Sequence, residues 1–244
     1  MRFPQPLVPG ELIRREKRFL AHVRLEDGRE VVAHTNNTGA MRGCSTPGSR
    51  VWLSPAANPK RKLKWTWELV EIADSPASVD PVLAGVNTIL PNKLVHEAIE
   101  REVIGGLQGY DGIRTEVKYG AEGSRIDLLL ERDGTAGQER CWVEVKNVTL
   151  VGADGVGAFP DAVTVRGRKH LRELGEMVQA GDRAVLFWTV QRGDITCVRP
   201  ADEVDPEYGA ELRRVSALGV EVMAWRAAVG VDGIDLVDEL PVVL

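Results

Sequence analysis

The sequence lacks the features that mark membrane and secreted proteins. No apolar run approaches the roughly 20 residues that a membrane-spanning helix requires. The first residues, MRFPQPLVPGELIRREKRF, contain no apolar segment typical of a secretory signal, so we expect none. Three cysteines, Cys44, Cys141 and Cys197, are an odd number and far apart, which predicts reduced thiols and no disulfide framework. These absences favour a cytoplasmic protein without a membrane partner.

Motifs for structural zinc and for small phosphate ligands are also missing. No two cysteines have the spacing of zinc ligands, and the sequence contains neither a Walker loop nor a dinucleotide-binding glycine loop. An enzyme acting on a small phosphate or sugar ligand is therefore the weakest of the functions considered below. What remains is ordinary: 244 residues, 43% hydrophobic and 27% charged, are enough for one large core or two smaller ones.

Charge is distributed unevenly along the chain. The net charge of -5 by itself argues against a nucleic-acid-binding protein. Residues 1–70, however, contain 13 Lys and Arg and 6 Asp and Glu, a net of +7, whereas the remainder contains 18 and 30, a net of -12. A basic first part joined to an acidic second part indicates an anionic partner for the first. The alternative is a basic surface that only faces solvent.

The first part of the chain reads as short strands separated by turns, without a good helix. Alternating side chains place Trp65, Trp67 and Leu69 on one strand face, and at least one of the two tryptophans is expected in the core. Several short strands within about 80 residues predict a small barrel, with an OB-type barrel as the natural candidate. The predicted strands are FLAHVRL, EVVAH, RVWLS and LKWTWELVEI.

A linker-like stretch, ADSPASVDP, separates this part from the rest. We predict domains at 1–82 and 83–244, although VLAGVNT, which follows the linker, could add one more strand to the barrel. The second part begins with helical spacing in PNKLVHEAIEREVIGGL, where Asn92 is a candidate N-cap and the glycine pair a candidate helix end. The following pattern of strands and helices, α-β-β-β-α-β and then α-β, predicts an α/β domain with a mixed sheet.

Two strand-like runs in this second part carry charges that a buried strand would not need. In SRIDLLLE, Asp127 lies opposite the face shared by Ile126, Leu128 and Leu130; in CWVEVKN, Glu144 and Lys146 share a face. If the two runs pair as a hairpin, Asp127 comes close to Glu144 and Lys146. Two adjacent carboxylates repel each other, and a divalent cation such as Mg²⁺ or Mn²⁺ relieves that repulsion. The alternative is a structural ion pair between Glu144 and Lys146.

An Asp on one strand followed by Glu-x-Lys on the next, behind a helix, is the arrangement of the PD-(D/E)xK nucleases. In this class Asp127, Glu144 and Lys146 would be the catalytic set. Asp127 and Glu144 would hold the metal, and Lys146 would hold or orient a water molecule. Glu97, on the first predicted helix, is a weaker candidate for a further metal ligand.

Longer motifs carry a resemblance to one family. In the first part they are KRFLA, NTGAMRGC, VWLS, NPKRK and TWEL; in the second they are VNT, EVKYG, SRID, VEVKNVTL and FPDAVT. With these motifs the chain resembles the sugar fermentation stimulation protein A family over nearly its whole length. The resemblance implies an N-terminal OB-like domain, a C-terminal PD-(D/E)xK nuclease-like domain and DNA binding with little sequence preference. One departure is Glu16, which stands where members often have an aromatic residue.

Basic residues suited to phosphate contacts fall into three groups. The first precedes Phe19, the second belongs to NPKRK, and the third opens the helix after FPDAVTV. These predicted nucleic-acid contacts are Arg15, Lys17, Arg18, Lys60, Arg61, Lys62, Arg166, Lys169 and His170. Asp161 in FPDAVT is expected either to hold its loop or to approach the metal.

The sequence thus favours a cytoplasmic DNA-binding protein with a metal-dependent nuclease site. A non-catalytic DNA-binding regulatory protein, linked to sugar metabolism, is the alternative. The complete acid-acid-lysine set favours the nuclease, because binding alone does not require it.

Overall fold

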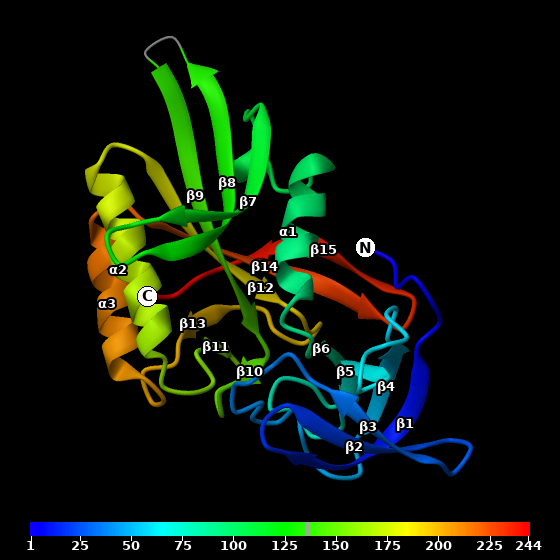
Figure 1. Cartoon of the computed structure of the whole chain (residues 1–244). Coiled ribbons are helices and arrows are strands. Elements are labelled where there is room, and N and C mark those ends of the chain that lie inside the picture. The colour runs from blue at the N-terminus through cyan, green and yellow to red at the C-terminus, as the bar shows by residue number, and fades with distance from the viewer. Residues whose placement is uncertain (135–136) are drawn as a thin grey trace.

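The N-terminal strands close into a small barrel in the computed structural model, which describes residues 1–134 and 137–244 (Figure 1). Neighbouring strands follow the order β3-β2-β1-β4-β5, and β3 also pairs in parallel with β5, which closes the barrel. The predicted barrel is confirmed, with β1 as a strand that the sequence analysis did not identify. The strands are β1 (Val8–Glu16), β2 (Leu20–Leu25), β3 (Glu30–His34), β4 (Arg50–Pro55) and β5 (Trp65–Ile72).

A bulge in β5 changes which side chains share a face. Leu53 pairs with Trp67 and Trp52 with Leu69, so Glu68 is the extra residue. Trp67 is fully buried in the barrel core, as expected for one of the two tryptophans. Leu69 instead packs with Trp52 in the core beneath the first helix, so the predicted common face with Trp67 is wrong.

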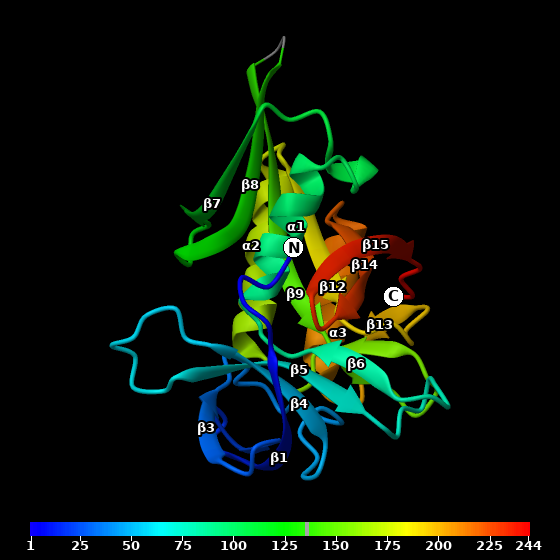
Figure 2. The same cartoon turned by 90° about the vertical axis from the view of Figure 1, so that its right-hand side faces the viewer.

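Both ends of the barrel segment form backbone contacts with the C-terminal part of the chain. Strand β6 (Val82–Gly85) pairs with β5, and its Ala84 bridges to Arg192 of the C-terminal part. At the other end, the first residues run along the C-terminal sheet: Phe3 N donates to Asp232 O at 3.1 Å. Figure 2 shows the barrel below the C-terminal sheet, with the N-terminus rising to meet it.

The C-terminal part is built on a twisted mixed sheet of order β15-β14-β12-β9-β8-β7. Strands β9, β12 and β14 run parallel, and the remaining neighbours are antiparallel, which confirms the predicted mixed sheet. Short strands β10, β11 and β13 form a small separate sheet beside it. The strands are β7 (Gly112–Tyr119), β8 (Ser124–Gly134), β9 (Gly137–Val148), β10 (Leu150–Val151), β11 (Gly157–Phe159), β12 (Arg183–Val190), β13 (Val198–Pro200), β14 (Glu221–Gly230) and β15 (Gly233–Leu240).

Helices cover both faces of this sheet (Figure 1). Helix α1 (Leu90–Glu100) packs on one face, and helices α2 (Val165–Gln179) and α3 (Pro206–Ala217) pack on the other. Helix α1 begins earlier than predicted, with Ile89 at the N-cap, because Pro91 suits a first turn that needs no N–H donor. Asn92 therefore lies inside the helix, where its amide is available to the site.

Among the described residues, no helix combines the length and the apolar character needed to cross a bilayer.

Candidate active site

Strands β8 and β9 separate at Asp127, and this fork creates the site. Their antiparallel pairing runs from the Gly134–Gly137 end of the hairpin to Leu128 opposite Val143. On the other side of β8, the pairing with β7 keeps its register but is interrupted at Glu116 and Asp127, and Glu116 has a φ of 55°, in the left-handed region. The chain twists there, so Ile126 and Leu128 belong to different cores, and the predicted common face of these two residues is wrong.

The fork leaves the Asp127 side chain outside the strand pairing and close to β9. Asp127 Oδ2 accepts a hydrogen bond from the backbone N–H of Val145 at 2.7 Å, and Oδ1 accepts one from Asn92 Nδ2 at 2.7 Å. Burial, followed by the charge of Glu144, raises the pKa of Asp127 to about 6. Lys146 and the two hydrogen bonds act in the opposite direction. A buried carboxylate near a second one is thus partly protonated near neutral pH unless a cation is present.

Glu144 is almost completely buried, with 2% of its surface exposed. Its Oε1 lies 2.5 Å from Lys146 Nζ and also contacts His170 Nδ1. Within the described part of the chain, its Oε2 has no hydrogen-bond partner. Although burial alone would raise its pKa, Lys146 and His170 hold the pKa of Glu144 below its ordinary value. The carboxylate is therefore charged, and one of its oxygens is buried without a hydrogen-bond partner among the described residues.

His170 belongs to this cluster. It is one of the residues predicted to contact nucleic acid, but only 4% of its surface is exposed and it lies against Glu144. Arg166 Nε donates to His170 Nε2 at 3.2 Å, so this ring nitrogen accepts a hydrogen bond. The hydrogen-bond network therefore assigns the proton of a neutral ring to Nδ1, which donates to Glu144 Oε1. Arg166 and His170 together fix the rotamer of the Glu144 carboxylate.

The structure brings Asp127, Glu144 and Lys146 together, whereas Glu97 lines a neighbouring cavity together with Asp127 but is engaged in ion pairs of its own. Glu97 Oε1 lies 3.1 Å from the amino group of Met1 and 3.4 Å from Arg101.

Among the described residues, no group of three or more His, Cys, Asp and Glu has the geometry of a metal site. The donor set of Asp127 and Glu144 nevertheless fits Mg²⁺ or Mn²⁺. These ions often take one or two protein carboxylates and complete their shell with water and phosphate oxygens, and Glu144 Oε2 is unpartnered.

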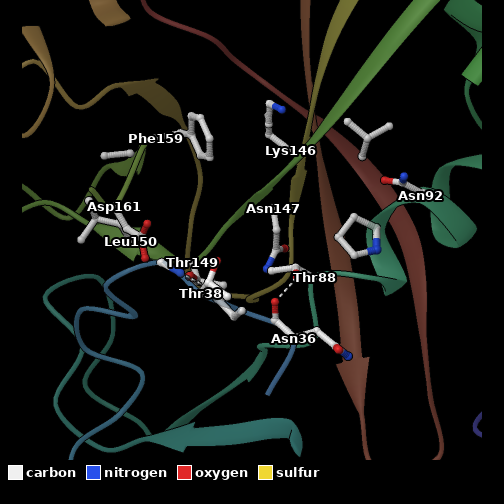
Figure 3. Close-up of a pocket in the computed structure, with 15 residues that line it drawn as sticks. Asn36, Thr38, Thr88, Asn92, Lys146, Asn147, Thr149, Leu150, Phe159 and Asp161 are labelled. Carbon is white, nitrogen blue, oxygen red and sulfur yellow. Dashed lines mark hydrogen bonds between the residues drawn. The ribbon is translucent and has the colours of Figure 1, made fainter. Parts of the chain in front are cut away.

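A cavity of about 260 Å³ lies beside Lys146, between the barrel and the C-terminal sheet (Figure 3). In this view Lys146 and Asn147 lie between Asn92 on one side and Phe159 and Asp161 on the other. The lining residues come from the loop after β3, the start of α1, the end of β9 and the β11 region. They are Asn36, Asn37, Thr38, Gly39, Thr88, Pro91, Asn92, Val145, Lys146, Asn147, Thr149, Leu150, Ala158, Phe159 and Asp161.

Asp161 fixes residues 36–41 of the barrel, the cavity loop, whose first four residues line this cavity. Its Oδ2 accepts a hydrogen bond from Met41 N at 2.8 Å. Gly39 lies so close that a Cβ there would meet the two Asp161 oxygens at 2.7 and 2.8 Å. Of the two predicted roles for Asp161, the structure supports holding a loop, although the loop belongs to the barrel.

The basic residues predicted to contact nucleic acid differ in how freely they can do so. The guanidinium of Arg15 donates to backbone carbonyls of Arg18, Asn37, Gly39 and Ala40, so it holds the cavity loop in place. Arg61 donates to Thr66 Oγ1 and Trp65 O. Lys169 Nζ donates to Glu122 O. The remaining predicted contacts, apart from the buried His170, are exposed to solvent: Lys17, Arg18, Lys60, Lys62 and Arg166.

Sequence reasoning missed two groups of site residues. Asn92 contacts Asp127, but its position near a helix start suggested a cap. Asn36 and Asn37 line the cavity next to Lys146, although they are more than 100 residues away in sequence. The motif NNTG favours a simple turn, and its polar side chains leave a ligand-binding loop as the alternative.

The fold defines a two-domain protein in which a closed OB-type barrel is joined to an α/β domain with a mixed sheet. The chain belongs to the sugar fermentation stimulation protein family, which confirms the resemblance stated from its motifs. Residues 13–79 match the family model for the SfsA N-terminal OB domain, and residues 89–233 match the sugar fermentation stimulation protein RE domain.

Relatives match over the entire chain. The sugar fermentation stimulation protein homolog of Geobacter metallireducens is 58% identical over 244 residues, covering 100% of both chains. The homolog of Geobacter sulfurreducens is 55% identical over 242 residues, covering 99% of this chain and 98% of its own. The structure of Pyrococcus furiosus SfsA in complex with Ca²⁺ has a TM-score of 0.85 and 27% identity, and the match covers 100% of this chain and 98% of that one.

Proposed function

We propose that this protein is a metal-dependent nuclease that acts on DNA bound between the barrel and the α/β domain. The observation that carries the proposal is the fork between β8 and β9, where Asp127, Glu144 and Lys146 meet. A purely structural ion pair would satisfy both oxygens of Glu144 and would not need a second buried carboxylate beside it. The free Glu144 Oε2 and the raised pKa of Asp127 are the features that this alternative leaves unexplained.

Asp127 and Glu144 would hold a divalent cation, Mg²⁺ or Mn²⁺. When bound, such an ion neutralises charge on the phosphate and activates water as a nucleophile. The Pyrococcus furiosus relative is described in complex with Ca²⁺, which also takes oxygen ligands, and this supports a divalent cation in the family fold. Asn92 and the N–H of Val145 orient the Asp127 carboxylate, while His170 orients that of Glu144.

In this proposal Lys146 acts on the attacking water. Its ammonium group contacts Glu144 Oε1 and lines the cavity, so it can donate to a water or a phosphate oxygen there. A fixed cation at this point stabilises the negative charge that develops during hydrolysis of a phosphodiester. The basic barrel supplies exposed Lys17, Arg18, Lys60 and Lys62 for phosphate contacts further along the strand.

The test is cleavage of end-labelled single-stranded and double-stranded DNA and RNA in Mg²⁺ or Mn²⁺. Wild type would be compared with Asp127→Ala and Lys146→Ala, and with Asp74→Ala as a control at an exposed position in the linker. We expect metal-dependent cutting that is lost in both site variants and kept in the control. If wild type binds DNA in a salt-dependent manner but never cuts, the non-catalytic regulatory function takes its place.

A further inference from the structure

We infer that the cavity beside Lys146 receives the base of one unpaired nucleotide next to the scissile phosphate. This inference rests on the proposed nuclease function and names its substrate class: a strand with at least one unpaired nucleotide at the site. Intact duplex would then be a poor substrate, because its bases are already paired and stacked.

The cavity wall has the character of a site for a neutral polar group. Among the described lining residues, Lys146 is the one cation, and the carboxylate of Asp161 is engaged by Met41 N. A pocket built for a phosphate would carry several cationic or N–H donors. The polar side chains here are instead amides and hydroxyls: Asn36, Asn37, Thr38, Thr88, Asn92, Asn147 and Thr149.

In three of these amides, a hydrogen bond engages either the side-chain nitrogen or the side-chain oxygen, and the other atom remains available. Asn36 Nδ2 donates to Asn87 Oδ1 at 2.8 Å, which leaves the side-chain oxygen of Asn36. Asn37 Oδ1 accepts from Gly39 N at 2.9 Å, which leaves its amide N–H groups. Asn92 donates to Asp127 and keeps its oxygen. The anchored amides therefore offer a fixed mixture of acceptors and donors, as the edge of a nucleobase requires.

Apolar side chains complete the cavity. Phe159 lines it, and its ring is fixed from behind by Trp188 and Tyr208, at centroid distances of 6.4 and 5.3 Å. Pro91 and Leu150 belong to the same lining. Unpaired bases are held in this way, between aromatic or apolar side chains and hydrogen bonds to the base edge.

The size of the cavity limits what can enter. About 260 Å³ is slightly below the roughly 300–1,000 Å³ typical of sites for drug-sized ligands, which suits one nucleoside and not a base pair. Lys146 of the proposed catalytic set lines the cavity, so the phosphate attached to a bound base would lie beside Lys146. The cavity thus selects for a strand whose base can leave the stack.

The experiment uses a single-stranded DNA with one 2-aminopurine, whose fluorescence rises when the base leaves its stacked neighbours. Binding is measured by anisotropy, and base entry by fluorescence, with the full-length protein and without Mg²⁺ or Mn²⁺. Thr38→Trp fills the cavity mouth, since Thr38 is exposed and lines the cavity. Thr46→Trp, at an exposed position outside the lining, is the matched control.

We expect a fluorescence rise with wild type and Thr46→Trp, and a rise at least five-fold smaller with Thr38→Trp. With metal added, cleavage next to a single abasic residue should be at least ten-fold slower than next to a normal nucleotide. A strand that binds without any rise, or an equal rise with Thr38→Trp, overturns the inference even if the protein cuts DNA. A rise without cleavage in either metal overturns the nuclease and leaves the base pocket standing. Absence of strand binding overturns both.

Discussion

The carboxylate of Asp127 on β8 accepts a hydrogen bond from the backbone N–H of Val145 on β9, with 2.7 Å between the two heavy atoms. This bond forms just beyond the point where pairing between the two strands ends. It replaces the missing backbone partner of Val145 and holds Asp127 beside Glu144. One residue therefore stabilises the fork and provides a proposed metal ligand.

Asp127→Asn should make the metal-free protein more stable at neutral pH. The pKa of Asp127 is about 6 in the folded protein, against an ordinary value of 3.8, so the native state holds this proton more tightly than the unfolded chain. The free energy of unfolding therefore falls as the pH rises from about 4 to 6, by up to about 3 kcal/mol for this group. In EDTA, melting temperatures measured across this range should fall more for wild type than for Asp127→Asn. If the melting temperatures of the two proteins fell in parallel, the raised pKa of Asp127 would be contradicted.

Metal should reverse this order of stability. A cation that binds only the native site stabilises it in proportion to its concentration. Adding Mn²⁺ at about 100 times its dissociation constant should stabilise wild type by about 2.7 kcal/mol and leave Asp127→Asn nearly unchanged. The measurement is the melting temperature of each protein as a function of the Mn²⁺ concentration. An equal rise in the variant would place the cation elsewhere.

His170→Ala should weaken metal binding without removing a proposed ligand. His170 donates to Glu144 and is itself held by Arg166, so its loss frees the Glu144 carboxylate to rotate. Residues that orient metal ligands typically contribute 10–100-fold in affinity or activity. The Mn²⁺ dissociation constant, measured by calorimetry, should rise by that factor. His22→Ala, on the barrel surface, is the control. An unchanged dissociation constant would mean that His170 contributes packing and does not orient Glu144.

Gly39→Ala should separate the cavity loop from Asp161. The new Cβ would lie within 2.8 Å of both carboxylate oxygens, so the loop or Asp161 must move. Overpacking of this kind costs about 1–3 kcal/mol. Gly193→Ala, where a Cβ meets nothing within 4 Å, should change the free energy of unfolding by less than about 0.5 kcal/mol. Urea denaturation compares the two variants, and equal costs would mean that the loop is free to shift.

Arg192→Ala should destabilise the junction between the domains. Arg192 and Asp194 form an ion pair at 2.7 Å with side chains only 3% and 2% exposed, and Arg192 also donates to Thr149 O. Removing one partner of a buried pair costs about 3–5 kcal/mol, because the other charge remains buried. Arg199→Ala breaks the exposed contact with Glu203 and should cost about 1 kcal/mol or less. Similar urea midpoints for both variants would contradict the role of the buried pair.

The sequence predicted the broad architecture because it depends on local patterns. Alternating strands and helical spacing correctly indicated a barrel followed by an α/β domain, whereas the linker-like stretch 73–81 joins β5 to β6, which pair with each other. Period-2 alternation failed at Glu68, where a bulge shifts the register of β5, and at Asp127, where β8 separates from β9. A bulge depends on pairing with a distant strand, so one strand's own pattern does not reveal it.

The acid-acid-lysine set was visible because Asp127, Glu144 and Lys146 lie on two strands joined by one hairpin. The residues that orient this set were not visible. Asn92 and His170 reach it from helices on opposite faces of the sheet, and helix packing decides which of their neighbours they meet. The cavity loop of the barrel was hidden for the same reason, because contact between the two domains places it beside Lys146.

The most direct test of the account is Mn²⁺ binding and Mn²⁺-dependent DNA cleavage measured on one preparation of wild type and Glu144→Gln. Glutamine keeps the size of the side chain and its contact with His170 but removes the charge that a cation needs. We predict one tight Mn²⁺ per chain and cleavage that saturates with Mn²⁺ occupancy in wild type, both lost in Glu144→Gln. Mn²⁺ binding or cleavage that persists unchanged in Glu144→Gln would contradict the proposed site.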